Sequence, residues 1–232
     1  MVEVFVGTSG WAYSWNPDGL EWYVRNSRLN AVELNASFYR FPFRNQVRGW
    51  ARRGSGLRWA IKVHRSITHY RKLSQASYPT WGRFRALFEP MEHLIDFYLL
   101  QLPPSYAMTE AGVERLRAFA EMAGLGERLA VEFRHQSWFS EEGLAVLKEA
   151  GATAVSVDSP EAVVYWSSNG VVYARLHGRT AWYAHEYSEE ELRSIAEEIA
   201  ALNPRRVYVF LNNDHWMLDN ARAMMTMLKE VL

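Results

Sequence analysis

The sequence predicts a single (β/α)8 barrel of the TIM type, with parallel strands, that occupies residues 1–232. Three observations predict this fold. The chain has 232 residues, and barrels of roughly 200–250 residues commonly fold as one unit. Eight short apolar runs alternate with amphipathic stretches along the whole chain. No linker rich in Pro or Gly divides it, so the strands are expected to form one sheet that closes on itself.

The eight candidate strands are rich in aliphatic and aromatic residues, and most are bounded by Gly, Pro, Asn or Ser. Several are nearly continuous apolar runs, which is typical of parallel strands covered on both faces. These strands are expected at residues 2–6, 31–34, 58–63, 97–101, 129–133, 154–157, 172–176 and 207–211.

Two of the helices between them are predicted from their capping residues. Thr109 precedes a helical pattern over residues 110–122, and Ser140 precedes one over residues 141–150. A hydroxyl oxygen at this position can accept a hydrogen bond from a free backbone N–H of the first turn. A glycine follows each pattern and marks its expected end.

Two further helices are predicted near the C-terminus. Ser188 and Glu191 have the spacing of a capping box, which leads into a helix over residues 192–202. Residues 217–232 form the last amphipathic segment. The segment 70–80 is the least regular part of the chain, and we treat it as a candidate lid. An open, doubly wound sheet is the main alternative, because it shows the same alternation of strands and helices.

The composition narrows the classes of partner. Lys plus Arg and Asp plus Glu balance at 26 each, so the formal net charge is zero. The protein as a whole does not attract the phosphates of nucleic acid electrostatically, and a nucleic-acid partner is not expected. The absence of cysteine excludes disulfides and thiolate nucleophiles. No basic segment followed by an apolar one begins the chain, and no apolar run approaches the ~18 residues that span a bilayer. We therefore expect a cytoplasmic protein without a membrane partner.

Polar residues stand at the C-terminal end of every candidate strand, where the active sites of such barrels lie. Because side chains alternate along a strand, Glu33 and Asn35 share one face, and so do Lys62 and His64. The other strand ends contribute Thr8, Gln101, Glu132, Arg134, Asp158, Arg175, His177, Arg179 and Asn212. We expect these side chains to meet in one pocket.

Several of these strand ends lie within motifs of one protein family. The motifs are GTSGWAYSW at 7–15, VELNASFYRFP at 32–42, IKVHRSITHYRKL at 61–73, LLQLPPS at 99–105, VEFRHQSWF at 131–139, YARLHGR at 173–179 and FLNND at 210–214. In this order, over essentially the whole chain, they resemble the domain-of-unknown-function family 72, also called YecE-like. The resemblance implies a TIM-type barrel but implies no reaction. The chain departs from the family pattern at residues 22–24 and 215–217.

The predicted pocket mixes carboxylates, cations and histidines, which favours general acid–base chemistry on a small anionic or sugar-like molecule. We expect Glu132 or Glu33 to act as the base and His177 as the acid. Cationic side chains would hold a phosphate or carboxylate, and aromatic ones would provide flat walls for a ring. The residues expected to bind the substrate are Thr8, Trp11, Tyr13, Asn35, Tyr39, Lys62, His64, His69, Gln101, Arg134, Trp138, Asp158, Arg175, Arg179 and Asn212.

Other interpretations of the same residues stay open. Glu33, Glu132, Asp158 and His177 are donors that a divalent metal accepts, as in metal-dependent isomerases and nuclease-like hydrolases. Two carboxylates at a suitable separation would also serve a glycoside hydrolase. Aromatic rings with arginines suit a non-catalytic module that binds a nucleotide or nucleic acid. The charged residues could instead form a purely structural ion network. No Walker motif is present, and we assign no cofactor and no metal ligand.

Overall fold

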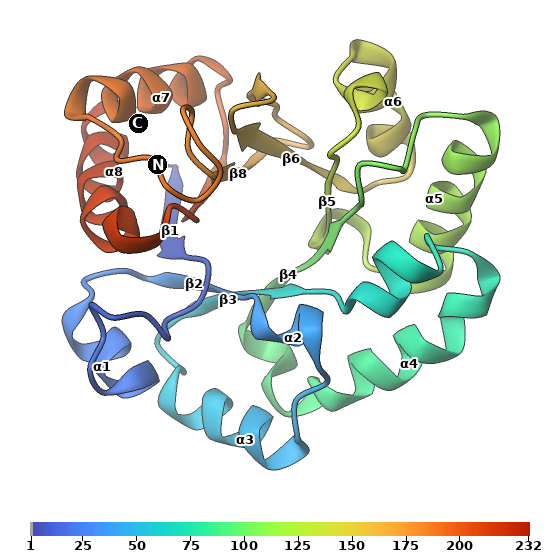
Figure 1. Ribbon diagram of the computed structural model, residues 1–232, viewed down its shortest axis with the longest axis horizontal. Coiled ribbons are helices and arrows are strands. Elements are labelled where there is room, and N and C mark those ends of the chain that lie inside the picture. The colour runs from blue at the N-terminus through green and yellow to red at the C-terminus, as the bar shows by residue number, and fades with distance from the viewer. Residues whose placement is uncertain (1) are drawn as a thin grey trace.

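A closed barrel of parallel strands lies at the centre of the molecule (Figure 1), in a computed structural model that describes residues 2–232. Its strands are β1 (Glu3–Thr8), β2 (Ala31–Leu34), β3 (Arg58–Lys62), β4 (Ile95–Gln101), β5 (Leu129–Glu132), β6 (Thr153–Asp158), β8 (Val171–Leu176) and β9 (Arg206–Leu211). They follow the order β5-β4-β3-β2-β1-β9-β8-β6, and β5 also pairs with β6. The predicted fold class is confirmed. The open-sheet alternative is wrong, because the pairing of β5 with β6 closes the cylinder.

A short additional strand, β7 (Val163–Val164), pairs antiparallel with the end of β6. The helices surround the barrel (Figure 1) and are α1 (Gly19–Asn26), α2 (Ala36–Tyr39), α3 (Arg44–Arg53), α4 (Tyr78–Leu87), α5 (Glu110–Ala123), α6 (Glu141–Glu149), α7 (Glu189–Ala201) and α8 (Met217–Val231). Thr109 and Ser140 each accept a backbone N–H of the following helix at 3.2 Å, and Ser188 with Glu191 forms the expected capping box. None of the helices in the described residues is long and apolar enough to cross a membrane.

Several boundaries differ from the prediction for a physical reason. The β1 strand extends to Thr8 because its ladder with β9 continues as far as Leu211. The segment 70–80 is more ordered than expected, since it contains a 3-10 turn at Gln75–Ser77 and the first turn of α4. Leu73 in this segment is fully buried. The segment therefore packs against the body of the protein, and its role as a lid stays a prediction.

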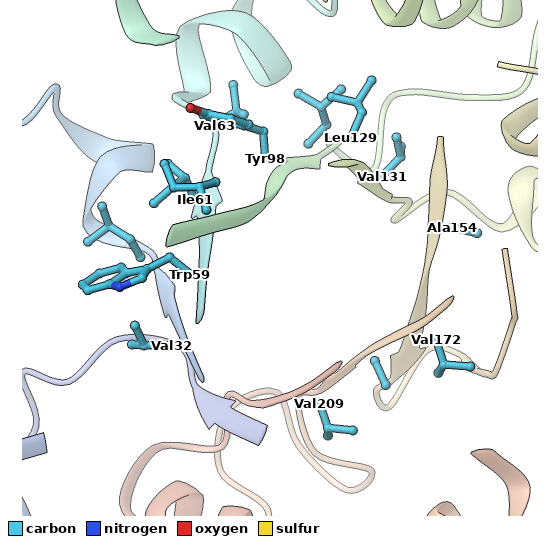
Figure 2. Close-up of a cluster of buried hydrophobic side chains, with 14 of the residues drawn as sticks. Val32, Trp59, Ile61, Val63, Tyr98, Leu129, Val131, Ala154, Val172 and Val209 are labelled. Carbon is cyan, nitrogen blue, oxygen red and sulfur yellow. The ribbon is translucent and has the colours of Figure 1, made fainter. Parts of the chain in front are cut away.

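The outer surface of the barrel carries aliphatic side chains that meet the helices. Figure 2 shows Val32, Ile61, Val131 and Val209 pointing away from the barrel axis. All four are buried and belong to one large apolar cluster that includes the inner faces of the helices. Successive strand residues point to opposite faces, so the residues between them point into the barrel.

The inside of the barrel is filled by aromatic rings. Phe97 stacks on Tyr173 with ring centroids 5.1 Å apart, and Tyr208 lies 4.8 Å from Phe97 and 4.7 Å from Phe5. Phe210 contacts Tyr173 edge to face at 5.1 Å. We call these five residues the aromatic plug. They precede the polar ends of their strands, so the plug shields those ends from water on one side.

A substitution at Gly7 tests whether β1 and β2 must approach as closely as they do. A Cβ at this position would lie 2.2 Å from the carbonyl oxygen of Ala31 on β2. We expect Gly7→Ala to lower the free energy of unfolding by about 1–3 kcal/mol or more, because the two strands must separate. Gly56→Ala is the matched control, since a Cβ there meets no atom within 4 Å. Equal melting temperatures for the two variants would contradict this expectation.

Candidate active site

A buried ionic layer crosses the barrel interior above the aromatic plug. Arg175 on β8 donates through Nε and Nη2 to the two carboxylate oxygens of Glu33, at 2.9 and 2.6 Å, and through Nη1 to Glu132. All three side chains are fully buried. Glu33 also accepts hydroxyl hydrogen bonds from Tyr173 at 2.7 Å and from Ser9 at 2.9 Å. Arg175 and Glu33 therefore each have the partners that the burial of a charge requires.

Arg134 and His177 extend this layer. Nη2 of Arg134 lies 2.5 Å from Oε1 of Glu132 and 3.1 Å from Nε2 of His177. The side-chain amide of Asn212 lies 3.1 Å from Nδ1 of the same ring. Burial, which Glu132 opposes and Arg134 and Arg175 reinforce, lowers the pKa of His177 to about 3. The ring is therefore uncharged at neutral pH, a state that does not suit the acid role expected for it.

The two arginines also fix the charge of Glu132. Burial favours the neutral acid, but Arg134 and Arg175 hold the pKa of this carboxyl well below its usual range. Protonation of Glu132 would weaken its ion pairs with both arginines. The expected role of Glu132 as a base stays a prediction. Because its carboxylate contacts both Arg134 and Arg175, a residue that faces open space is better placed to accept a proton.

Lys62, at the end of β3, is the ionisable group of this layer that reaches open space. Its side chain is 8% exposed, and Nζ lies 4.5 Å from the centre of the Phe38 ring. Among residues 2–232 no carboxylate oxygen lies within 4.0 Å of Nζ. Burial and the charge of Arg175, only partly offset by Glu132 and Glu33, lower its pKa to about 7. The Phe38 ring attracts the cation by about 2 kcal/mol at such a buried site, which is too little to restore an ordinary lysine pKa.

A cavity of about 280 Å³ opens above Lys62 at the barrel mouth. Its lining combines amides, hydroxyls, one amine and one carboxylate. The lining residues are Tyr13, Asn35, Tyr39, Lys62, Tyr183, Asn212, Asp214 and Met217. A second cavity of about 290 Å³, more apolar and lined partly by Trp11 and Trp50, shares Tyr13 and Asn35 with the first. Oδ1 of Asn35 is buried and accepts no hydrogen bond from the described residues.

Residues 5–232 match the sequence model of a family described as "Protein of unknown function DUF72". The chain belongs to this family. The resemblance in the motifs is thus confirmed for DUF72, and the match includes all of the barrel strands except the first two residues of β1.

Solved structures agree with this assignment. A DUF72 protein of Thermotoga maritima MSB8 is 28% identical, with a TM-score of 0.81 and 99% of both chains covered. A DUF72 protein of Enterococcus faecalis V583 is 20% identical, with a TM-score of 0.83 over 97% of this chain and 95% of that one. A xylose isomerase domain containing protein of Salmonella typhimurium LT2 is 16% identical, with a TM-score of 0.59 over 91% and 90%, which shows the fold alone. No curated protein matches the chain.

The structure brings most of the predicted residues of this DUF72 chain to one region, in two tiers. Tyr13, Asn35, Tyr39, Lys62 and Asn212 line the first cavity, and Trp11 lines the second. The ionic layer beside them contains Glu33, Glu132, Arg134, Arg175 and His177. His69 is close to these groups as well, since burial, Lys62 and Arg134 lower its pKa to about 4.

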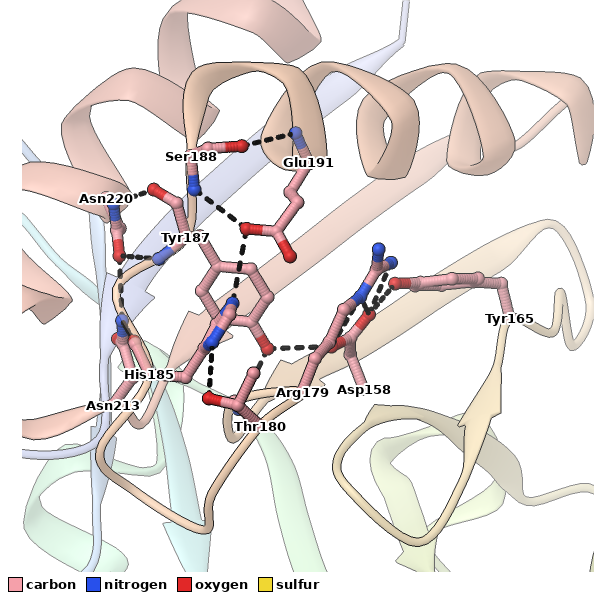
Figure 3. Close-up of polar contacts among 11 residues, drawn as sticks. Asp158, Tyr165, Arg179, Thr180, His185, Tyr187, Ser188, Glu191, Asn213 and Asn220 are labelled. Carbon is pink, nitrogen blue, oxygen red and sulfur yellow. Dashed lines mark hydrogen bonds and ion pairs between the residues drawn. The ribbon is translucent and has the colours of Figure 1, made fainter.

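Asp158 and Arg179 form a separate cluster, which Figure 3 shows. Nη2 and Nε of Arg179 donate to Asp158 at 2.9 and 3.0 Å. Asp158 also accepts the hydroxyl hydrogen bonds of Tyr187 at 2.7 Å and Tyr165 at 2.5 Å. The carboxylate is fully buried, and neither it nor Arg179 lines either cavity. This cluster ties the loop after β8 to β6.

Trp138, Thr8 and His64 also have partners within the protein. Trp138 is fully buried, stacks on Phe133 at 4.0 Å, and donates Nε1–H to a backbone carbonyl. Thr8 donates to the carbonyl of Gly10 at 2.6 Å, within the turn after β1. His64 accepts the backbone N–H of Ser66 at 3.1 Å, at the start of a π-helical turn, Ser66–Tyr70.

Gln101, at the end of β4, lines neither cavity. Conversely, three residues of the first cavity, Tyr183, Asp214 and Met217, were not among the expected site residues. Asp214 closes the FLNND motif after β9 and has a φ of 57°. Its place in the polar run Asn212-Asn213-Asp214, which follows β9, was the available signal for it.

Removal of Arg175 should destabilise the protein strongly. We expect Arg175→Met to cost about 3–5 kcal/mol, because Glu33 and Glu132 would keep buried charges without their shared partner. The combined variant Arg175→Met, Glu33→Gln, Glu132→Gln should recover part of this loss. Urea unfolding followed by circular dichroism measures both.

The matched control for Arg175 is Arg193→Met. Arg193 pairs with Glu230 on the surface, where the two side chains are 49% and 51% exposed, and such pairs contribute at most about 1 kcal/mol. A loss for Arg175→Met as small as the loss for Arg193→Met would show that the ionic layer is not a structural requirement.

The reactivity of Lys62 should follow its lowered pKa. Below about pH 7 the amine is protonated, and above it the free amine predominates. We expect the rate of acetylation at Lys62 to rise through pH 7 and to level off near pH 8, as measured by trace labelling and peptide mass spectrometry. An ordinary lysine would continue to gain reactivity toward pH 10. A rate at Lys62 that still rises above pH 9 would refute this.

Proposed function

We propose that this DUF72 chain is an enzyme of general acid–base chemistry that acts on a small, sugar-like molecule with a carbonyl group. One observation carries the proposal: an amine without an ion-pair partner among the described residues lies at the wall of a cavity, among amides and hydroxyls. Perturbed ionisable groups in a cleft are typical of catalytic sites.

Lys62 is the proposed base of this reaction. A group with a pKa of about 7 exchanges a proton readily at neutral pH. Asp214 faces the same cavity and is the proposed second proton carrier. Asn35 and Asn212 provide amide groups for substrate oxygens. This assignment moves the proton-transfer role from the paired glutamates and His177 to residues that face open space.

The charges favour a sugar-like substrate over a phosphate. In the ionic layer two arginines, Arg134 and Arg175, face two glutamates, Glu33 and Glu132, so their charges cancel. Asp214 adds a carboxylate to the cavity wall, and a doubly charged phosphate would meet repulsion there. The lining amides and hydroxyls match the hydroxyl groups of a sugar instead.

The other interpretations have less support. Among the described residues, no group of three His, Asp or Glu side chains is arranged to hold a metal ion. Glu33, Glu132 and Asp158, the carboxylates of the metal alternative, are each bound to arginine. A non-catalytic module would need the cavity to bind, but would not need an amine with a lowered pKa.

Deuterium exchange tests the proposal. The protein is incubated in heavy water with D-xylose, D-fructose or dihydroxyacetone, and proton NMR follows exchange at the carbon beside the carbonyl. We expect the wild type to accelerate exchange for at least one of them, and Lys62→Met to slow it by at least about 100-fold, because proton transfer loses its base.

Lys148→Met is the matched control, since Lys148 is exposed on α6, and its exchange rate should equal that of the wild type. Undiminished exchange in Lys62→Met would overturn the role of Lys62. A sugar that raises the melting temperature without any exchange would favour the non-catalytic binding module.

A further inference from the structure

The geometry of the cavity points to a covalent role for Lys62. We propose that its amine adds to the carbonyl carbon of the substrate and forms an imine, so that the substrate is held by a C=N bond during proton transfer. This inference rests on the acid–base function proposed above, but it makes Lys62 the group that binds the substrate covalently and passes the role of base to Asp214.

The position of the amine supports this role. Lys62 projects from the end of a barrel strand, and its stem is enclosed, so that 8% of the residue is exposed. The Phe38 ring lies against Nζ at 4.5 Å. No hydrogen bond or ion pair joins Nζ to any of residues 2–232, so its lone pair is free to attack a molecule in the cavity.

Burial, together with the charges around the amine, favours its reactive, unprotonated form. Arg175 and Arg134 oppose its protonation, and Glu33 and Glu132, which favour it, are held by these same arginines. A lysine that is desolvated and placed beside another cation is an activated nucleophile for carbonyl compounds. The pKa of about 7 leaves about half of the molecules with a free amine at neutral pH.

The step balances without a further reactant. Nζ attacks the carbonyl carbon to form a C–N bond, and the carbonyl oxygen takes up a proton to give a carbinolamine. Nitrogen releases one of its two protons, the hydroxyl takes up a second proton and leaves as water, and the nitrogen keeps its last proton as the C=N bond forms. The products are a protonated imine and one water molecule, so that one proton is consumed overall. Asp214, on the same cavity wall, is the group that can carry these protons.

With an imine, the carboxylate of Asp214 in the cavity wall is a strong enough base for the proposed proton transfer. A protonated imine withdraws electrons from the neighbouring carbon and makes its C–H bond more acidic than in the free carbonyl compound. A weak base such as the carboxylate of Asp214 can then remove that proton. The amides of Asn35 and Asn212 would hold the hydroxyl groups of the same molecule.

Reductive trapping in the wild-type protein tests the proposal. The folded protein is incubated at pH 7 with dihydroxyacetone and sodium cyanoborohydride, which delivers a hydride to the imine carbon and leaves a stable secondary amine. Peptide mass spectrometry then locates the added mass, which is that of the ketone less one oxygen atom. Glycerol, which lacks the carbonyl group, is the matched reagent control.

The chain contains its own reference groups, because Lys72, Lys148 and Lys229 are the only other lysines. We expect Lys62 to be trapped more than about tenfold faster than these three in the folded protein, as its amine is the activated one. In urea the preference should disappear. Comparison within one protein makes the result independent of the folding of any variant.

Two outcomes separate this inference from the function on which it rests. Equal or slower trapping at Lys62, together with deuterium exchange that requires Lys62, would overturn the imine and leave the amine as a simple base. Preferential trapping at Lys62 without exchange of any sugar would keep the imine and overturn the proton-transfer function.

Discussion

The ion pairs of Arg175 with two glutamates are the interaction on which the upper half of the barrel depends. A TIM-type barrel fills its interior with side chains from alternating positions, and here the last layer is charged instead of aliphatic. Burial of three charges is tolerated because Arg175 contacts both glutamates and because Tyr173 and Ser9 complete the hydrogen bonding of Glu33. The layer joins β2, β5 and β8, which are distant in sequence.

This pairing also affects the charge of the ionisable groups beside it. Burial lowers the pKa of Lys62 and of His177, and the nearby glutamates restore neither pKa because Arg134 and Arg175 oppose them. The two residues then differ through exposure. His177 is enclosed, with neighbours at both ring nitrogens, whereas Lys62 reaches the cavity. His177 is therefore held by neighbouring side chains, whereas the amine of Lys62 can contact a molecule in the cavity.

The sequence was sufficient to predict the barrel, the capped helices and the meeting of the polar strand ends, because these follow from local patterns and from the direction of parallel strands. It was not sufficient to predict which polar residues face open space. Asp158 follows the same strand-end pattern as Glu132, but its partners Tyr165 and Tyr187 come from loops whose paths no local pattern predicts. Trp138 likewise stacks on Phe133 because of the 3-10 turn Gln136–Trp138, which the sequence pattern did not predict.

The aromatic plug limits the routes by which molecules can enter and leave the site. Because five rings fill the cylinder directly beneath the charged layer, the interior offers no passage to the opposite end. Whatever enters must leave by the rim where Tyr39 and Tyr183 stand, 63% and 44% exposed. Water released in a condensation would share that exit with the product.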